Sequence, residues 1–152
     1  MHRTALFPGS FDPFTVGHVD IIHRSLQLFD KMVIGVGHNS TKQTMFTIEQ
    51  RMQWIKDSLN DKPTIEVQSY NGLTVDFAKR IGAQFILRGL RTSTDFQFEK
   101  AIAQMNTLMD AKIETIFILS SPEYAPVSST IVRDIIRNGG DVSRFVASGV
   151  KF

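Results

Sequence analysis

A strand, a polar loop and the start of a helix follow one another in the stretch Thr4-Ala5-Leu6-Phe7-Pro8-Gly9-Ser10-Phe11-Asp12-Pro13-Phe14-Thr15-Val16-Gly17-His18. Residues 4–7 form a short apolar run that stops at Pro8-Gly9, which is typical of a buried strand entering a tight turn. After the loop, apolar residues recur at helical spacing between residues 19 and 29. The stretch therefore predicts a strand–loop–helix unit that carries polar side chains in its loop.

The same alternation continues along the chain. Apolar runs predict four more strands, at residues 33–36, 64–67, 85–87 and 115–119, the fourth strand of the chain being broken by Gly89. Helical spacing and capping signals predict helices at residues 48–59, 73–81, 98–109 and 131–136, and the phenylalanines on apolar stripes are assigned to the core. Five short strands separated by helices indicate an α/β fold: a mostly parallel five-stranded sheet, doubly wound with helices on both faces.

Length and composition limit the class of protein. The chain has 152 residues, so we expect a single domain over residues 1–152. Hydrophobic residues make up 42% and charged residues 21%, which excludes a disordered or collagen-like chain. A formal charge of +2 is too small to indicate a nucleic-acid partner, and the lack of cysteine excludes thiolate chemistry. Because no apolar run approaches the roughly 20 residues that cross a bilayer, we expect a cytoplasmic protein without a membrane partner.

The loop before His18 is the first candidate site, since ligands of parallel sheets bind at the carboxyl ends of the strands. His18 falls in the first turn of a helix, where free backbone N–H groups and the helix dipole favour an anion. Gly17 leaves room for a phosphate, and the imidazole N–H of His18 can donate to a phosphoryl oxygen. A surface histidine beside a helix cap is the alternative for this residue taken alone.

Other loops at the same sheet edge carry groups suited to phosphate. Arg88 and Arg91 leave the fourth strand at a spacing that suits bidentate contacts. Residues 128–130 place three hydroxyl groups at the start of the last helix, with Arg133 one turn inside it, and Lys42 follows the second strand. Each feature alone is also explained as a helix cap or a solvated cation. Together they predict one site for the phosphate chain of a nucleotide.

The motifs in these loops resemble those of the nucleotidylyltransferase superfamily. Thr15-x-Gly17-His18 is similar to the signature T/H-x-G-H, and Ser128-Ser129-Thr130-Ile131-Val132-Arg133 resembles the second signature, I-S-S-T-x-x-R. Lys42 and Arg88-Gly89-Leu90-Arg91 with Asp95 and Glu99 narrow the resemblance to the phosphopantetheine adenylyltransferase family. The resemblance implies a Rossmann-like nucleotidylyltransferase domain, a homohexamer, and adenylyl transfer from ATP to 4′-phosphopantetheine in coenzyme A biosynthesis.

Site residues follow from the resemblance, position by position. It implies that His18 stabilises the transition state and that Ser10, Lys42 and Arg91 assist it. The residues implied to bind 4′-phosphopantetheine are Ser10, Lys42, Thr74 and Arg88. Those implied to surround ATP are Ser10, Phe11, His18, Gly89, Leu90, Arg91, Glu99, Tyr124, Ala125, Pro126, Val127, Ser128, Ser129 and Thr130.

The implied reaction is a direct in-line attack of one phosphate on another. Both reactants are anions, so positioning and positive charge can supply most of the acceleration. Mg²⁺ is the expected cofactor because it shares the charge of the triphosphate, and no residue is assigned as a dedicated metal ligand. Two alternatives stay open: a small nucleotidylyltransferase that uses nicotinamide mononucleotide or a polyol phosphate as acceptor, and a nucleotide-binding module without catalysis.

Overall fold

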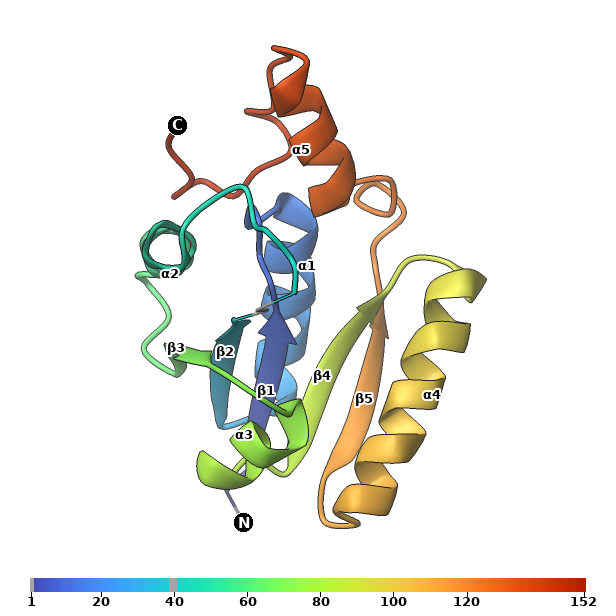
Figure 1. Cartoon of the computed structure of the whole chain (residues 1–152). Coiled ribbons are helices and arrows are strands. Elements are labelled where there is room, and N and C mark those ends of the chain that lie inside the picture. Colours follow the sequence, from blue (N-terminus) through green and yellow to red (C-terminus); the bar gives the residue numbers. More distant parts are fainter. Residues whose placement is uncertain (1, 39–40) are drawn as a thin grey trace.

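One parallel β-sheet forms the centre of the molecule (Figure 1). The computed structural model describes residues 2–38 and 41–152. Over these residues the sheet consists of β1 (Thr4–Gly9), β2 (Lys31–Gly37), β3 (Ile65–Tyr70), β4 (Phe85–Leu90) and β5 (Glu114–Leu119), in the spatial order β3-β2-β1-β4-β5. Every neighbouring pair runs parallel. The predicted α/β fold with a five-stranded parallel sheet is confirmed, and its strand order is Rossmann-like.

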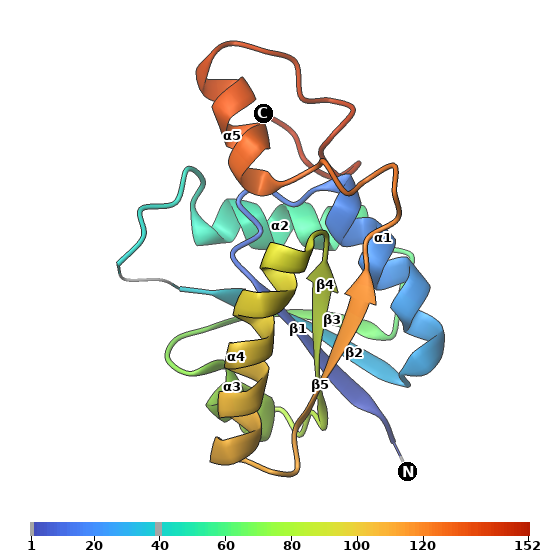
Figure 2. The same cartoon turned by 90° about the vertical axis from the view of Figure 1, so that its right-hand side faces the viewer.

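Helices cover both faces of the sheet, as Figures 1 and 2 show. On one face lie α1 (Val16–Ser25), followed by a short 3₁₀ helix (Leu26–Leu28), and α2 (Ile48–Ser58). On the other face lie α3 (Thr74–Arg80) and α4 (Ser93–Met109). The remaining helix, α5 (Ser129–Arg137), lies beyond the carboxyl ends of the strands. The doubly wound arrangement is therefore confirmed.

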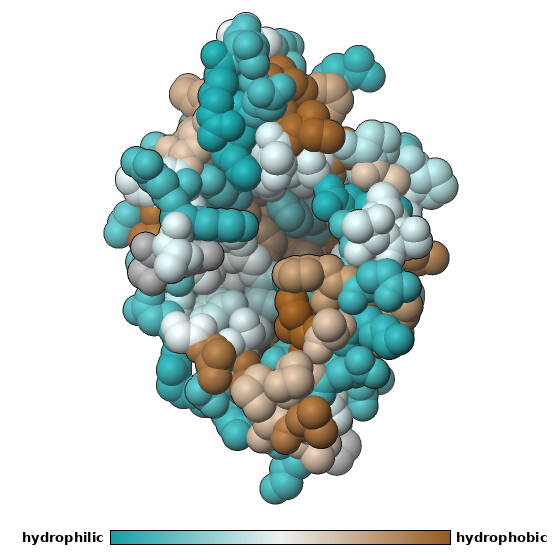
Figure 3. All heavy atoms as spheres, turned by 45° about the vertical axis from the view of Figure 1, so that its right-hand side comes forward, coloured by the Kyte–Doolittle hydropathy of each residue, from teal (hydrophilic) through white to brown (hydrophobic). Residues whose placement is uncertain are grey.

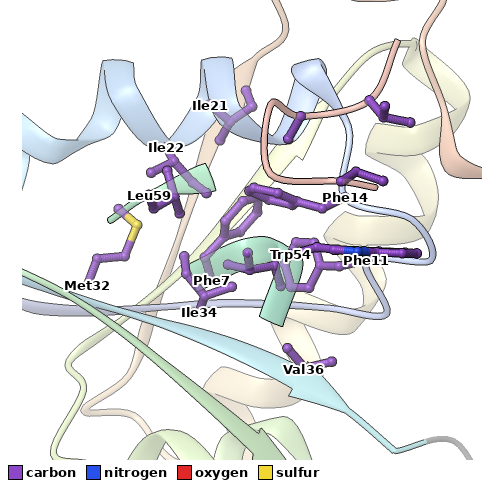
Figure 4. Packing of buried hydrophobic residues seen from close by; sticks show 14 of the residues in the cluster. Phe7, Phe11, Phe14, Ile21, Ile22, Met32, Ile34, Val36, Trp54 and Leu59 are labelled. Carbon is purple, nitrogen blue, oxygen red and sulfur yellow. The ribbon is translucent and has the colours of Figure 1, made fainter. Parts of the chain in front are cut away.

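Alternating residues of the central strands supply two hydrophobic clusters, because successive side chains of a strand point to opposite faces. Phe7 and Ile34 belong to the larger cluster, with Trp54 of α2 (Figure 4). Leu6 belongs to the smaller cluster, with Phe77 of α3. The sheet is thus buried on both faces, and polar groups that bind ligands are left to its edges.

β1 and β4 separate before β1 ends, which leaves space between the loops that follow them. β1 pairs with β2 along all of Thr4–Gly9, whereas its pairing with β4 covers Ala5↔Phe85 and Leu6↔Ile86. After β1 the chain crosses toward β2, while β4 lies on the opposite side of β1. The loops that follow β1 and β4 therefore diverge at the point where the strand order reverses, which is where open α/β sheets bind ligands.

Three predicted strand ends are wrong: β3 runs on to Tyr70, and β1 and β4 also continue past their apolar runs. β1 continues through Pro8-Gly9 because β4 has already separated there, so the missing N–H of Pro8 costs no ladder hydrogen bond on that side. β4 continues through Gly89, which pairs with Ile118 of β5. β1 and β4 therefore reach further toward the site than their apolar runs indicate.

The assignment of Phe98, on α4, to the core is wrong as well. Phe98 is 68% exposed, Met105 56% and Leu108 79%, whereas Asn106 is buried. α4 therefore packs on the sheet through another side and leaves much of its apolar surface uncovered within this chain. In the part of the chain that the structure describes, no helix has the length and apolar character needed to cross a membrane.

Candidate active site

The start of α1 fixes the orientation of His18. Thr15 caps the helix: its Oγ1 accepts a hydrogen bond from the His18 backbone N–H at 3.3 Å, and its own N–H donates to His18 Nδ1 at 3.0 Å. This is a capping box in which histidine takes the place of the usual Glu or Gln. Because Nδ1 accepts, the proton of the neutral ring lies on Nε2, which is left for a ligand.

His18 is held in its neutral form. Burial lowers its pKa to about 3, and the positive charges of Arg91 and Arg88 act in the same direction. The ring stacks on Phe14 at a centroid distance of 5.6 Å and meets the edge of Phe11 at 4.9 Å. The two aromatic rings cover much of the partly buried imidazole, and the two arginines disfavour a further positive charge. His18 is therefore a neutral hydrogen-bond donor beside two cations.

The first cavity, of about 320 Å³, opens at the carboxyl ends of β1 and β4. Its wall is built by the loop after β1, the segment before α2, the end of β4, the side of α4 and the start of α5. The site residues expected from the sequence that line it are Ser10, Phe11, His18, Lys42, Arg88, Gly89, Arg91, Glu99, Val127, Ser128, Ser129 and Thr130. Segments far apart in the sequence therefore meet in one space of ligand size that is lined by four cations and three carboxylates.

A second cavity, of about 460 Å³, adjoins the first, and Figure 3 shows the surface hollowed on this side of the molecule. Ser10, Arg88 and Glu99 line both cavities. Beyond them the second cavity runs past Thr74, whose Oγ1 lies 2.9 Å from the hydroxyl of Tyr70. The two spaces share a wall at Ser10 and Arg88, which suits two ligands that react with each other.

Arg88 is fixed between the two cavities. Its Nε donates to one Glu99 carboxylate oxygen at 2.8 Å and its Nη2 to the other at 2.6 Å, while Nη1 donates to the Pro8 carbonyl at 2.7 Å. A bidentate pair of this kind is both strong and directional. Arg91, the outer cation, pairs with Asp95 at 3.2 Å. In this structure the Glu99 carboxylate is therefore occupied in holding Arg88.

The loop after β1 is tied to the start of α5. Ser129 Oγ donates to the Pro13 carbonyl at 2.8 Å, and Arg133 Nη1 donates to the Asp12 carbonyl at 2.7 Å. Ser128 caps α5 by accepting from a backbone N–H in its first turn. These contacts bring the second signature motif against the first and turn the N-terminus of α5 toward the cavity.

Four residues expected near ATP line neither cavity, namely Leu90, Tyr124, Ala125 and Pro126. Leu90 is buried at the end of β4. The carbonyls of Tyr124 and Val127 lie 3.8 and 3.7 Å from the position that a Cβ on Gly17 would take. This segment therefore lies behind the start of α1, and its contacts with ATP stay a prediction.

Sequence reasoning missed three charged residues around the site. Asp20 on α1 accepts hydrogen bonds from the Ser121 hydroxyl and backbone and from Arg24, which holds the segment after β5. Asp12 is 3% exposed and Arg51 on α2 is also 3% exposed. Asp12 lies inside the quoted loop, but nothing in the local pattern distinguishes Arg51 from a surface cation. The partners of Arg51 are brought to it by the tertiary fold.

The acidic groups of the site suit a metal that arrives with its own ligands. Among the described residues there is no group of three or more histidine and acidic side chains able to hold a metal ion. Asp95 and Glu99 are paired with arginines, and both Asp12 oxygens accept backbone N–H groups. Mg²⁺ keeps much of its water and commonly binds through substrate phosphates, which fits this donor set.

The chain is similar to known nucleotidylyltransferases over nearly its whole length. Residues 6–135 match the family model described as cytidylyltransferase-like. A relative named phosphopantetheine adenylyltransferase from Flavobacterium psychrophilum is 54% identical, with 98% of each chain covered. A relative of the same name from Bacteroides fragilis is 47% identical over 98% of this chain and 99% of its own.

Solved structures share the fold at low sequence identity. A putative nicotinate-nucleotide adenylyltransferase from Vibrio parahaemolyticus superposes with a TM-score of 0.72 at 20% identity, covering 99% of this chain and 96% of its own. A bifunctional NMN adenylyltransferase/ADP ribose pyrophosphatase from Francisella tularensis has a TM-score of 0.76 at 19% identity. This chain is 98% covered in that match and spans 46% of the bifunctional chain.

Proposed function

Because the chain belongs to the cytidylyltransferase-like family and, within it, to the phosphopantetheine adenylyltransferases, we propose that it transfers the adenylyl group of ATP to 4′-phosphopantetheine. An oxygen of the acceptor phosphate bonds to the α-phosphorus, and the bond from the α-phosphorus to the leaving pyrophosphate breaks. The products are dephospho-coenzyme A and pyrophosphate, which makes the reaction a step of coenzyme A biosynthesis. The meeting of two cavities at Ser10 and Arg88 carries the proposal.

Charge at this junction offsets the repulsion between the two reactants. Lys42 and Arg88 hold the acceptor phosphate, and the Ser10 hydroxyl donates a hydrogen bond to it. His18 donates its Nε2–H to the oxygen of the α-phosphate where charge develops, as its neutral state and fixed tautomer support. The acceptor phosphate is already ionised at neutral pH, so the reaction needs no general base.

The first cavity holds ATP. Its β- and γ-phosphates lie against Arg91, Ser129 and Thr130, where the N-terminus of α5 favours negative charge. The adenosine lies near Phe11, Gly89, Leu90, Glu99 and the segment 124–128. The second cavity, which runs past Thr74, takes the pantetheine arm.

Mg²⁺ accompanies the triphosphate in this proposal. When bound, it shares the negative charge of the phosphate oxygens and so favours departure of pyrophosphate. A solved relative of the same fold, the bifunctional enzyme from Francisella tularensis, is described in complex with AMP and a manganese ion. The protein supplies cations and hydroxyls around the phosphates, and the metal is carried by the nucleotide.

We further propose a cytoplasmic homohexamer. The exposed apolar side chains of α4 support self-association, because contiguous apolar surface on one helix is costly in water. Figure 3 shows an apolar patch on this side of the molecule, below the hollow. The proposed reaction uses ATP and a small phosphorylated acceptor, which supports a cytoplasmic location.

Product formation tests the proposed function. Purified protein is incubated with ATP, Mg²⁺ and an acceptor, and mass spectrometry follows the adenylylated product while pyrophosphate is measured separately. We expect dephospho-coenzyme A from 4′-phosphopantetheine and no comparable product from nicotinamide mononucleotide or a polyol phosphate. Preference for one of those acceptors would replace the substrate assignment, and ATP binding without pyrophosphate release would indicate a non-catalytic module.

Stereochemistry tests the direct transfer. An in-line attack without a covalent enzyme intermediate inverts the configuration at the α-phosphorus. We therefore expect inversion when ATP carries a chiral α-thiophosphate. Retention would show that an enzyme nucleophile takes the adenylyl group first.

A further inference from the structure

A buried arginine joins the segment that carries Lys42 to the loop that carries Ser10. Arg51 lies on α2 and is 3% exposed. Its Nη1 donates to the Ser10 carbonyl at 2.6 Å, and its Nε donates to the carbonyls of Phe46 and Thr47 at 3.1 and 3.3 Å. One guanidinium therefore bridges backbone groups that are 36 residues or more apart in the sequence.

A second contact closes the same junction from the other side. The Asp12 carboxylate accepts hydrogen bonds from the backbone N–H groups of Met45 and Phe46 at 2.8 and 2.9 Å. Phe46 is thus held twice, through its carbonyl by Arg51 and through its N–H by Asp12. Residues 45–47 are therefore positioned by two side chains, one of which belongs to the loop after β1.

These contacts lie directly behind two groups that line the first cavity. Lys42 precedes Met45 by three residues, and its side chain is exposed in the cavity. Ser10 lines both cavities, and the carbonyl of the same residue accepts from Arg51. The distance between the Lys42 ammonium and the Ser10 hydroxyl therefore depends on how the segment before α2 is fastened to the loop after β1.

We propose that Arg51, together with Asp12, is a positioning residue that sets Lys42 against Ser10 for binding of the acceptor phosphate. The inference rests on the proposed function and adds to it a residue that touches neither substrate. Arg51 acts through Lys42, and its loss leaves ATP in place while the acceptor is held poorly.

Arginine is required here by geometry as well as by charge. A planar guanidinium can reach three carbonyls in different directions, whereas a lysine ammonium is a single point on a flexible stem. A buried cation also needs its hydrogen bonds to offset the cost of leaving water. The Arg51→Lys variant keeps the charge and loses the bridge, which makes it the informative substitution.

The first test compares the KM for 4′-phosphopantetheine with the KM for ATP. For Arg51→Lys we expect the KM for 4′-phosphopantetheine to rise about tenfold or more, because a misplacement of roughly 1 Å costs up to about a hundredfold. The KM for ATP should change less than about twofold, since Arg91, Ser129 and Thr130, which we propose hold its β- and γ-phosphates, lie on other segments. Asp12→Asn, which loses one of two acceptors at the same junction, should shift the acceptor KM in the same direction.

Ser58→Ala is the matched control on the same helix. Ser58 Oγ accepts from the Gly149 N–H at 2.9 Å and lines neither cavity. The substitution weakens the attachment of α2 to the C-terminal segment without touching the junction, so both KM values should stay unchanged. Thermal melts of all variants show how far each one is destabilised.

A double-mutant cycle with Lys42→Ala tests the route of the effect. If Arg51 acts through Lys42, then Arg51→Lys should change the acceptor KM by less than about twofold once Lys42 is absent, since the interaction has already been lost. A multiplicative effect of the two substitutions, or an equal rise of both KM values, would overturn the positioning role. Should Arg51→Lys fail to fold, the same cycle with Asp12→Asn decides between these outcomes.

The wild-type reaction keeps this inference separate from the proposed function. If the wild type forms dephospho-coenzyme A but the two substitutions multiply each other's effect on the acceptor KM, only the role of Arg51 is contradicted. No product from the wild type with any acceptor contradicts the proposed function itself. In that case calorimetric titration of 4′-phosphopantetheine into the wild type and the variants still tests whether Arg51 supports acceptor binding, and equal affinities would overturn it.

Discussion

His18 illustrates how a single residue is adapted to its task by its neighbours. Thr15 fixes its tautomer, the Phe11 and Phe14 rings pack against the imidazole, and burial together with two arginines keeps it uncharged. A neutral donor is suited to an oxygen on which negative charge increases during the reaction, because its hydrogen bond strengthens as the transition state forms. Ser10 and Lys42 differ in that they are exposed and depend on their backbone for position.

Substitution of His18 tests this role. His18→Ala should lower kcat about 10²- to 10³-fold, the cost typical of removing one preorganised donor to a developing negative charge. The KM for ATP should change little, since the proposed contact strengthens mainly in the transition state. Steady-state rates of pyrophosphate release measure both quantities. A kcat equal to that of the wild type would exclude His18 from the chemical step.

The lowered pKa of His18 also makes stability depend on pH. The unfolded chain binds a proton at this residue below a pH of about 6.5, whereas the folded protein does so only near pH 3. The contribution of His18 to the free energy of unfolding is therefore fully present above pH 6.5 and is lost as the pH falls toward 3. The wild type should lose more unfolding free energy between pH 7 and pH 4.5 than His18→Gln does.

Urea unfolding at the two pH values provides the measurement, and the difference between the proteins removes the contribution of the shared carboxylates. Equal losses in the wild type and in His18→Gln would mean that the imidazole titrates near its ordinary value in the folded state.

Among the elements, the start of α1 carries the densest set of site features. Gly17 and His18 in its first turn line the first cavity, while the N–H of Val16 donates to the Phe145 carbonyl and that of His18 to Thr15 Oγ1. A Cβ at Gly17 would lie 3.5 Å from Thr15 Oγ1 and 3.7 Å from the Val127 carbonyl, which is ordinary contact. The fold therefore tolerates a side chain here, and we propose that the glycine leaves room for the phosphates of the ligand.

Gly17→Ala tests whether the glycine is needed by the fold or by the ligand. Alanine favours the helix by up to about 1 kcal/mol, so the melting temperature should stay equal or rise slightly. The kcat/KM for ATP should fall, because the methyl group occupies space beside the phosphates. Thermal melts and initial rates measure the two effects. Unchanged kinetics would show that no phosphate approaches the backbone at this position.

Most elements and the three motif-bearing loops could be predicted from the sequence because they depend on local patterns. Apolar runs mark the buried strands, and capping residues mark the starts of α2 and α5. The exposure of α4 could not be predicted, since an apolar stripe has the same pattern whether it faces the core or another surface. Arg51 could not be assigned either, because its role depends on Ser10, which is 41 residues away and is brought to it by the fold.

At the scale of the whole molecule, strand order decides where the chemistry lies. β1 and β4 are neighbours. The chain continues from β1 to β2 on one side and from β4 to β5 on the other, and the two cavities open beside the carboxyl ends of β1 and β4. The hydrophobic clusters on the two faces pack the helices against the strands that end at this edge. Ile102 is exposed on α4 and also lines the second cavity, so the assembly and the acceptor binding that we propose involve the same helix.

Substitutions on this face test the proposed assembly. Met105→Glu with Leu108→Glu places two charges on the exposed apolar surface of α4, and a packed interface between copies cannot accommodate them unpaired. Sedimentation velocity should show a hexamer for the wild type and smaller species for the double variant. The same hexamer in both proteins would exclude this face from the interface.

The account as a whole depends on the reacting phosphates meeting between His18 and Arg88. A crystal structure with bound dephospho-coenzyme A tests this most directly, because the product contains both halves of the reaction. We predict its bridging diphosphate about 3 Å from His18 Nε2, with the adenosine in the first cavity and the pantetheine arm along the second. A diphosphate away from His18, or a product confined to one cavity, would contradict the account.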